Sequence, residues 1–209
     1  MPLSYNRIAG KNLHRLEALA DGVFAVAMTL LVLDLKTPAL TVIHGEGDLL
    51  RALLALAPRL LTYLMSFLTL GIFWLGQQAQ FNLLERGNRD VVWVHILFLA
   101  SVCLLPFSTA LLAQFIAYRV ALLAYWANIF LLGALLLLSW RLARRASLVK
   151  PDLPAGIDRA IYSRIIVAQA LYGFAAVLCV ISTTWSIALI VLLQINYALA
   201  PRIGRFALP

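Results

Sequence analysis

Long runs of residues with almost no charged side chain recur along the chain, and they decide what it can fold into. A helix of about 20 apolar residues spans the roughly 30 Å hydrocarbon core of a bilayer, and several runs here reach about 18 residues or more. The composition agrees, because 63% of the 209 residues are hydrophobic and 12% are charged, whereas soluble domains average about 45–50% and about 25%. We therefore predict an all-α integral membrane protein.

The runs predict six transmembrane helices joined mostly by short polar links. We expect helices over residues 15–35, 52–77, 91–114, 119–141, 161–181 and 185–200, with loops at 36–50 and 142–160. Pro106 falls inside the third helix, where it removes a backbone donor and predicts a kink. No linker or internal repeat divides the spans, so we predict that residues 1–209 form a single six-helix transmembrane domain.

The basic residues predict the orientation in the membrane. With six spans, both termini lie on one side, and 13 of the 17 Lys and Arg residues fall on that side. Cytoplasmic segments carry the excess of Lys and Arg, so both termini are expected in the cytoplasm of a multi-pass cell-membrane protein, the inner membrane in a bacterium. Membrane lipid also accounts better than nucleic acid for the net charge of +8, because the charge lies in loops beside apolar runs.

The sequence contains no pattern that predicts an enzyme. No nucleophile elbow, zinc-protease motif or phosphate-binding glycine loop occurs, and the three His residues are far apart in the chain. Cys103 and Cys179 lie inside apolar runs and predict no disulfide. We therefore expect no catalytic residues, no metal site and no cofactor.

The first predicted helix carries an unusual stripe of residues. Alternating steps of four and three place the stripe on one helical face; it consists of Arg15, Leu19, Gly22, Val26, Thr29 and Leu33, with Leu30 beside it. We interpret this stripe as the lining of a pore, and plain packing is the alternative. Six helices in one small chain would pack closely and leave no channel between them, so a pore would need several copies of the chain around a symmetry axis.

Asp21 lies on the same helix but points away from the stripe. An ionisable group at the bilayer centre costs roughly 2.5–3.5 kcal/mol on insertion scales, so it should be paired or face water. It is either an ion or proton site or a structural acid held through Arg15, Trp74 or Gln77. We favour the structural role because the Asp21 side chain points away from the stripe.

A cluster of amide side chains follows Trp74; its members are Gln77, Gln78, Gln80 and Asn82. We expect these amides either to bond to the first helix or to be solvated at the membrane interface.

Three stretches of the sequence resemble a known family. The run from Arg15 through Leu33, RLEALADGVFAVAMTLLVL, resembles the first helix of the lysosomal-type potassium channel family in its prokaryotic six-helix branch, whose signature is R-x-x-x-F-S-D followed by G-V-F-A-I-A-x-T-L-L-V-L. Leu19 and Ala20 stand where the family has Phe and Ser. The run W-x-x-Q-Q-x-x-F from Trp74 is similar to the family's W-x-x-H-H-x-x-F, and Leu105-Pro106-Phe107 fits its third helix.

The resemblance implies a potassium-permeable cation channel, a homotetramer in which four copies of the first helix line a central pore. It implies that Val26, Leu30 and Leu33 form a hydrophobic constriction and that Thr29 supplies a pore-facing hydroxyl. It implies that Arg15 and Asp21 belong to a polar network that holds the helix, which Trp74 and Gln77 would complete. The alternatives are a small-solute or proton-coupled transporter, which usually shows broken helices and midplane polar groups, and a non-transporting membrane scaffold.

Overall fold

The computed structural model describes residues 12–39 and 43–199, and the regular elements in these ranges are helices. Seven α-helices occur there: α2 (Leu13–Leu30), α3 (Glu46–Ala55), α4 (Ala57–Leu83), α5 (Arg89–Gln114), α6 (Arg119–Arg145), α7 (Ile157–Val177) and α8 (Thr183–Leu199). Two short 3-10 helices continue α2 and α7; they are η1 (Leu31–Asp34) and η3 (Leu178–Val180). The all-α class predicted from the sequence is confirmed.

Five helices in the described ranges are long and apolar enough to cross a membrane. They are α2 with η1, α4, α5, α6, and α7 with η3. The remaining apolar helix, α8, has 17 residues, about 25 Å at 1.5 Å per residue, and is shorter than a typical span. The predicted sixth helix extends to residue 200, which lies outside the described residues, so the count of six spans stays a prediction.

The segment before α4 differs from the predicted loop over 36–50 and helix from 52. The helix α3 begins at Glu46 and ends at Ala55, and α4 begins at Ala57. The acidic residues that suggested a loop stabilise the start of α3 instead, since Asp48 accepts a hydrogen bond from the backbone N–H of His44 at 3.1 Å. Pro58 then sits in the first turn of α4, where its missing N–H costs nothing.

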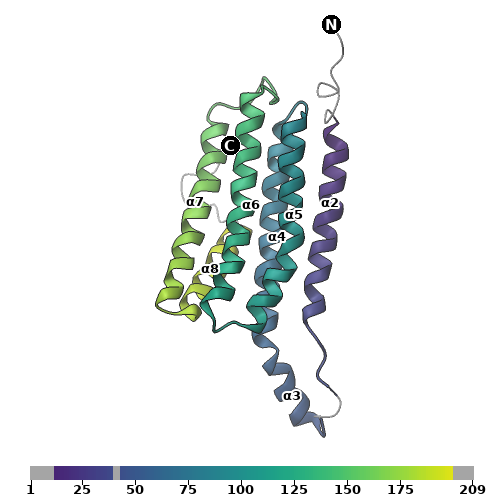
Figure 1. The fold of residues 1–209 in the computed structure, drawn as a ribbon, viewed down its shortest axis with the longest axis vertical. Coiled ribbons are helices and arrows are strands. Elements are labelled where there is room, and N and C mark those ends of the chain that lie inside the picture. The colour runs from purple at the N-terminus through teal and green to yellow at the C-terminus, as the bar shows by residue number, and fades with distance from the viewer. Residues whose placement is uncertain (1–11, 40–42, 200–209) are drawn as a thin grey trace.

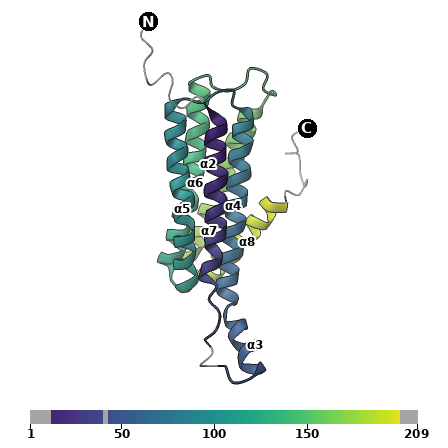
Figure 2. The same cartoon turned by 90° about the vertical axis from the view of Figure 1, so that its right-hand side faces the viewer.

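The helices form an elongated bundle with α2 at one edge. Figures 1 and 2 show α2 lying against α5 and α4, while α7 and α8 cover the opposite edge. The start of α2 and the links α4–α5 and α6–α7 lie at one end of the bundle, and α3 projects past the other end (Figure 1). The basic link between α6 and α7 is therefore at the same end as the start of α2.

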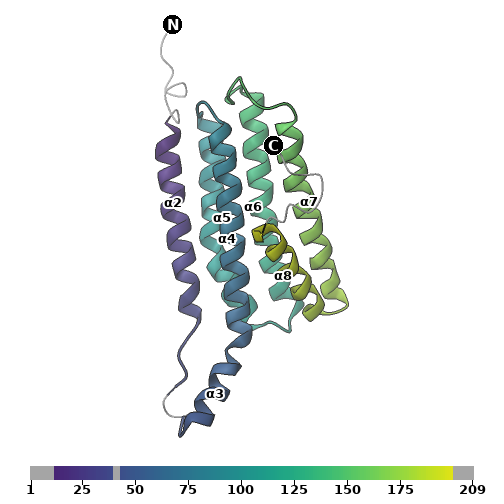
Figure 3. The ribbon, with the colours of Figure 1, turned by 180° about the vertical axis from the view of Figure 1, so that it is seen from behind.

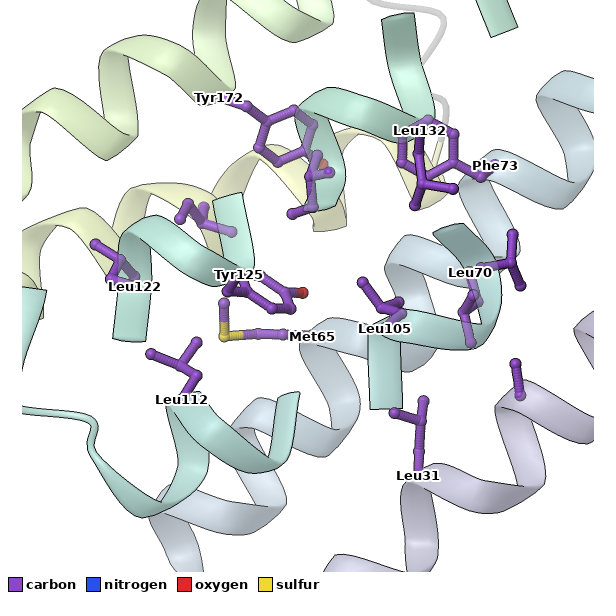
Figure 4. Packing of buried hydrophobic residues seen from close by; sticks show 14 of the residues in the cluster. Leu31, Met65, Leu70, Phe73, Leu105, Leu112, Leu122, Tyr125, Leu132 and Tyr172 are labelled. Carbon is purple, nitrogen blue, oxygen red and sulfur yellow. The ribbon is translucent and has the colours of Figure 1, made fainter. Parts of the chain in front are cut away.

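The core contains both apolar side chains and a buried hydroxyl cluster. Figure 4 shows Leu31, Leu70 and Leu105 pointing toward one another from α2, α4 and α5. Nearby, the hydroxyl of Tyr125 lies 3.3 Å from Ser66 Oγ and 3.2 Å from Thr69 Oγ1. Gln194 of α8 donates to Thr69 Oγ1 at 2.8 Å, so this cluster ties α4, α6 and α8 together.

A second buried amide supports α5 where Pro106 interrupts its hydrogen bonds. In the amide orientation that satisfies both its nitrogen and its oxygen, the Asn128 side chain donates to the backbone carbonyl of Ser101 at 3.0 Å and accepts from the backbone N–H of Leu105 at 3.1 Å. These two backbone groups bond to each other in an uninterrupted helix. Pro106 thus lies inside a continuous α5, and α6 supplies hydrogen-bond partners beside it.

Candidate pore-lining face

One face of α2 packs into the bundle. Asn12 caps the start of the helix, because its side chain accepts a hydrogen bond from the backbone N–H of Arg15 at 3.3 Å. The inward face is buried to 5% exposure or less and consists of Leu16, Ala20, Phe24, Ala27 and Leu31. The ring of Phe24 lies 6.0 Å from that of Phe98 in α5, centroid to centroid, which fixes α2 against its neighbour.

The stripe occupies the outward face of the same helix. Val26, Leu30 and Leu33 are 57%, 45% and 68% exposed, and Leu19 is 51% exposed. Arg15, Gly22 and Thr29 are exposed as well. The stripe therefore takes no part in the packing of the described chain, and α2 itself lies at one edge of the bundle (Figure 1).

Thr29 is the one hydroxyl in the stripe. Its Oγ1 donates to the backbone carbonyl of Val26 at 2.8 Å. Because the hydroxyl proton is used in this bond, the lone pairs of Oγ1 remain free to accept a hydrogen bond from water or to contact a cation. Both Thr29 and Val26 are on the exposed face, so the oxygen lies among apolar side chains.

Asp21 contacts the neighbouring helix α4. The indole Nε1 of Trp74 donates to Asp21 Oδ1 at 2.8 Å. Among the described residues, no hydrogen bond or ion pair joins Asp21 to Arg15 or to Gln77. Arg15 is exposed, and Gln77 is buried with an Oε1 atom that has no partner in the described part of the chain. Of the three partners considered from the sequence, the structure brings only Trp74 to the carboxylate.

Two of the amide residues that follow Trp74 have hydrogen-bond partners outside α2. Gln80 is 3% exposed and donates to the backbone carbonyl of Leu136 in α6 at 3.2 Å. Asn82 is exposed at the end of α4, and its backbone carbonyl accepts a hydrogen bond from Lys150 Nζ at 2.7 Å. Neither expectation for this cluster describes Gln80, because its side chain is buried and bonds to α6 instead of the first helix.

His95 is a buried polar residue that the sequence motifs did not single out. Its ring stacks on Phe81 at 4.4 Å between centroids, and its Nδ1 lies 3.1 Å from Ser139 Oγ. The side chain joins α4, α5 and α6 on the inside of the bundle. A single His within an apolar run was the only signal for this position.

Comparison with known proteins identifies the family. Residues 15–106, from the first turn of α2 into α5, match the model of a family described as "Endosomal/lysosomal potassium channel TMEM175". A potassium channel of Streptomyces collinus is 34% identical over 188 residues, which cover 88% of this chain and 90% of the relative. The chain belongs to the TMEM175 family. A potassium channel of Chamaesiphon minutus is 35% identical over 192 residues, covering 88% of this chain and 93% of the relative.

The TMEM175 fold extends over nearly the whole chain. The crystal structure of a lysosomal potassium-selective channel TMEM175 homolog from Chamaesiphon minutus matches with a TM-score of 0.77 and 30% identity. The match covers 90% of this chain and 97% of that chain, so it reaches past residue 106. The TMEM175 family is one of ion channels, and family membership confirms both the resemblance seen in the sequence and the prediction that the chain is not an enzyme.

Proposed function

We propose that this chain forms a potassium-permeable channel in the cell membrane, in which four copies surround a pore lined by α2. The observation that carries the proposal is the outward stripe of α2, which is apolar, unpacked and interrupted by one hydroxyl. Helix α2 lies at the edge of the bundle, so its stripe can meet equivalent stripes from other copies around an axis (Figure 2). The family and the names of the bacterial relatives support potassium as the permeant ion.

The narrow part of the proposed pore is formed by Val26, Leu30 and Leu33. These side chains are exposed at successive levels along α2. An apolar ring excludes water when it is narrow, and an ion there would lose its hydration without replacement ligands. Potassium would then pass only when the ring widens enough to keep water around it.

Thr29 supplies the one polar side chain at this level. Its Oγ1 is left as an acceptor because its proton is bonded to the Val26 carbonyl. Four such oxygens around an axis would replace part of the hydration shell of a potassium ion. The hydroxyl thereby lowers the free-energy barrier to potassium passage through an otherwise apolar segment.

Asp21 and Trp74 hold α2 in the orientation that presents the stripe. Their hydrogen bond is on the side of α2 that meets α4, away from the stripe. Arg15 and Gln77 complete this polar network at the same end of the bundle in the proposed assembly. Asp21 then acts on the channel through the position of α2.

In the proposed orientation both termini lie in the cytoplasm. The chain would reside in the bacterial inner membrane, and residues 1–209 would act as one six-helix unit. The start of α2, the α4–α5 link and the α6–α7 link share one end of the bundle (Figure 1). These segments carry most of the Lys and Arg residues. The excess of positive charge at that end supports its placement on the cytoplasmic side.

The direct test is potassium flux into liposomes that contain the purified chain, with the mass of the solubilised oligomer measured in parallel. We expect potassium-dependent flux and a mass of four chains. Flux that requires a proton gradient would favour a proton-coupled transporter. Absence of flux from correctly assembled protein would favour a scaffold, and either result would overturn the proposal.

A further inference from the structure

A groove opens on the side of the bundle far from α2. It has a cavity volume of about 100 Å³ and lies between α4 and α7, with α6 as its floor. The groove exists because α8 is short: Figure 3 shows α8 slanting across α6 and ending part-way along the bundle. Beyond the end of α8, near Tyr197, Gly133 and Leu136 of α6 form the buried floor of the groove.

The walls of this groove are apolar along most of their length. Small or aliphatic side chains line it on both sides, from α4 and from α7; they are Ile72, Gly76, Ala79, Ile161, Ile165 and Ala168. Gly133 in the floor allows the side chain of Gln169 to lie directly across α6, where a Cβ would overlap it. The shape suits a flexible hydrocarbon chain.

Arg164 adds a positive charge to the groove. It lies seven residues after the start of α7, about 10 Å along the helix, and it lines the groove while its head is exposed. Among the described residues, no acidic side chain pairs with Arg164. By contrast, Arg144 at the end of α6 is 2.8 Å from Asp158. The groove therefore has an unneutralised guanidinium, which suits a phosphate group.

Two amide oxygens in the groove lack hydrogen-bond donors. Gln80 is 3% exposed and its Nε2 donates to the Leu136 carbonyl, but its Oε1 has no partner among the described residues. The Oε1 of Gln169 is in the same state, while its Nε2 donates to the Ile129 carbonyl at 3.4 Å. A buried carbonyl oxygen without a donor is costly, so a ligand that brings hydroxyl groups would be favoured.

We propose that this groove binds an anionic phospholipid with a hydroxylated headgroup, such as phosphatidylglycerol. An acyl chain lies along the apolar walls, the phosphate contacts Arg164, and a headgroup hydroxyl donates to Gln80. Phosphatidylcholine offers a phosphate but no donor, and its choline group is repelled by Arg164. The ten residues after α8 suit the groove less well, because they contain Arg202 and Arg205 and no acidic residue.

The test is native mass spectrometry of the full chain, purified in detergent and incubated with phosphatidylglycerol or phosphatidylcholine of matched acyl chains. We expect the wild-type protein to retain phosphatidylglycerol severalfold more than phosphatidylcholine. Arg164→Gln should abolish this preference. Arg159→Gln makes the same charge change on an exposed residue of α7 outside the groove and should keep it. Equal retention by the wild-type and Arg164→Gln proteins would overturn the proposal.

Two further substitutions separate the groove from other lipid sites. Ala168→Phe places a ring in the groove and should lower the retention of both lipids. Val167→Phe, at the adjacent exposed position, should not lower it.

A truncated chain tests whether the tail occupies the groove. A chain ending at Leu199 should retain the same amount of lipid as the full chain. A gain of bound lipid on this truncation would show that the tail fills the groove. Equal lipid retention by the wild-type and Ala168→Phe oligomers would show that the groove is covered or unused. Either result would overturn the proposal.

Discussion

The indole nitrogen of Trp74 donates a hydrogen bond to the carboxylate of Asp21 across 2.8 Å, and this bond joins α4 to α2. It lies on the side of α2 that turns away from the stripe, while the stripe itself is exposed along the edge of the bundle. A single helix therefore carries a polar contact to α4 and an apolar face that remains free.

The Asp21–Trp74 bond should contribute to assembly. Trp74→Phe keeps an aromatic ring but removes the donor, so we expect a loss of about 1 kcal/mol in stability, the typical net value of an interhelical hydrogen bond. Asp21→Ala should also lower the yield of folded oligomer. The measurement is the fraction of oligomer that survives a series of heating steps in detergent.

Asp21→Asn and Trp93→Phe are the matched controls for this bond. Asparagine retains an acceptor oxygen for the Trp74 indole, so assembly should be largely preserved. Trp93 is 55% exposed on α5, and its replacement should have little effect. Normal assembly of Asp21→Ala together with a sharp change in ion selectivity would instead place Asp21 on the ion path.

The apolar ring on α2 should control resting conductance. Val26→Asn or Leu30→Asn keeps water in a narrow apolar segment, so resting potassium flux should rise. Val26→Phe enlarges the side chain and should suppress flux. Single-channel or liposome recordings at matched protein levels provide the comparison.

Met28→Asn is the control for the ring, because Met28 is partly buried and packs against the core on another side of α2. It should not raise flux and should only impair assembly. The stripe does not line the pore if flux is unchanged by the substitutions at Val26 and Leu30 but rises in Met28→Asn.

The Thr29 hydroxyl should lower the barrier within the apolar segment. Thr29→Val has nearly the same shape but lacks the oxygen, so potassium flux should fall severalfold. Thr29→Ser retains the oxygen and should conduct nearly as well as the wild type. Equal flux through the Thr29→Val and wild-type channels would show that the oxygen does not contact the permeating ion.

The proposed topology predicts which loops can be labelled from outside the cell. In a chain whose two native cysteines are replaced by serine, a membrane-impermeant thiol reagent should label Gly47→Cys in α3. The reagent should not label Lys150→Cys, which lies at the opposite end of the bundle. Both positions are exposed in the structure. The reverse labelling pattern would invert the assigned sides of the membrane.

Gly133 should be intolerant of even a small side chain. Gly133→Ala would place its Cβ against the amide of Gln169, so that side chain must leave its position and lose its bond to Ile129. Overpacking of this kind typically costs about 1–3 kcal/mol. Thermal unfolding in detergent measures the loss, and Gln169→Ala should rescue it.

Gly173→Ala provides the opposite expectation for a glycine within α7. Its nearest side-chain neighbour, an atom of Trp126, would lie 3.9 Å from the added Cβ, an ordinary contact. Alanine is favoured over glycine in a helix interior by roughly 0.5–1 kcal/mol, so stability should be unchanged or slightly higher. A loss in Gly173→Ala as large as that in Gly133→Ala would show that close packing at Gly133 is not the cause.

Local features of the sequence were sufficient for several elements of the fold. The apolar runs predicted the membrane class and the approximate positions of α2, α4, α5, α6 and α7, because the length and polarity of a spanning helix are properties of the segment itself. The periodicity of α2 placed Val26, Thr29, Leu30 and Leu33 on one face for the same reason. Residue spacing also placed Asp21 away from that face.

The helix α3 shows where local reasoning failed. Its acidic residues, Glu46 and Asp48, resembled those of a loop, but they lie in a short helix in which Arg51 pairs with Asp48 at 2.7 Å. The amides of α4 are a second case, since Gln80 bonds to α6 and not to α2. Both segments are polar, as expected from their sequence, but polarity alone does not specify the hydrogen-bond or ion-pair partner of each side chain.

The sequence by itself determined that this chain is a bundle of membrane-spanning helices with an apolar stripe on the first one. Only the tertiary structure decided which apolar face of α2 is buried, that Trp74 is the partner of Asp21, and that α8 leaves a groove beside Arg164. The physical reason is that apolar side chains are stable both in the bundle and against lipid, so hydrophobicity does not distinguish inward from outward faces. Those faces are set by the packing of several helices at once.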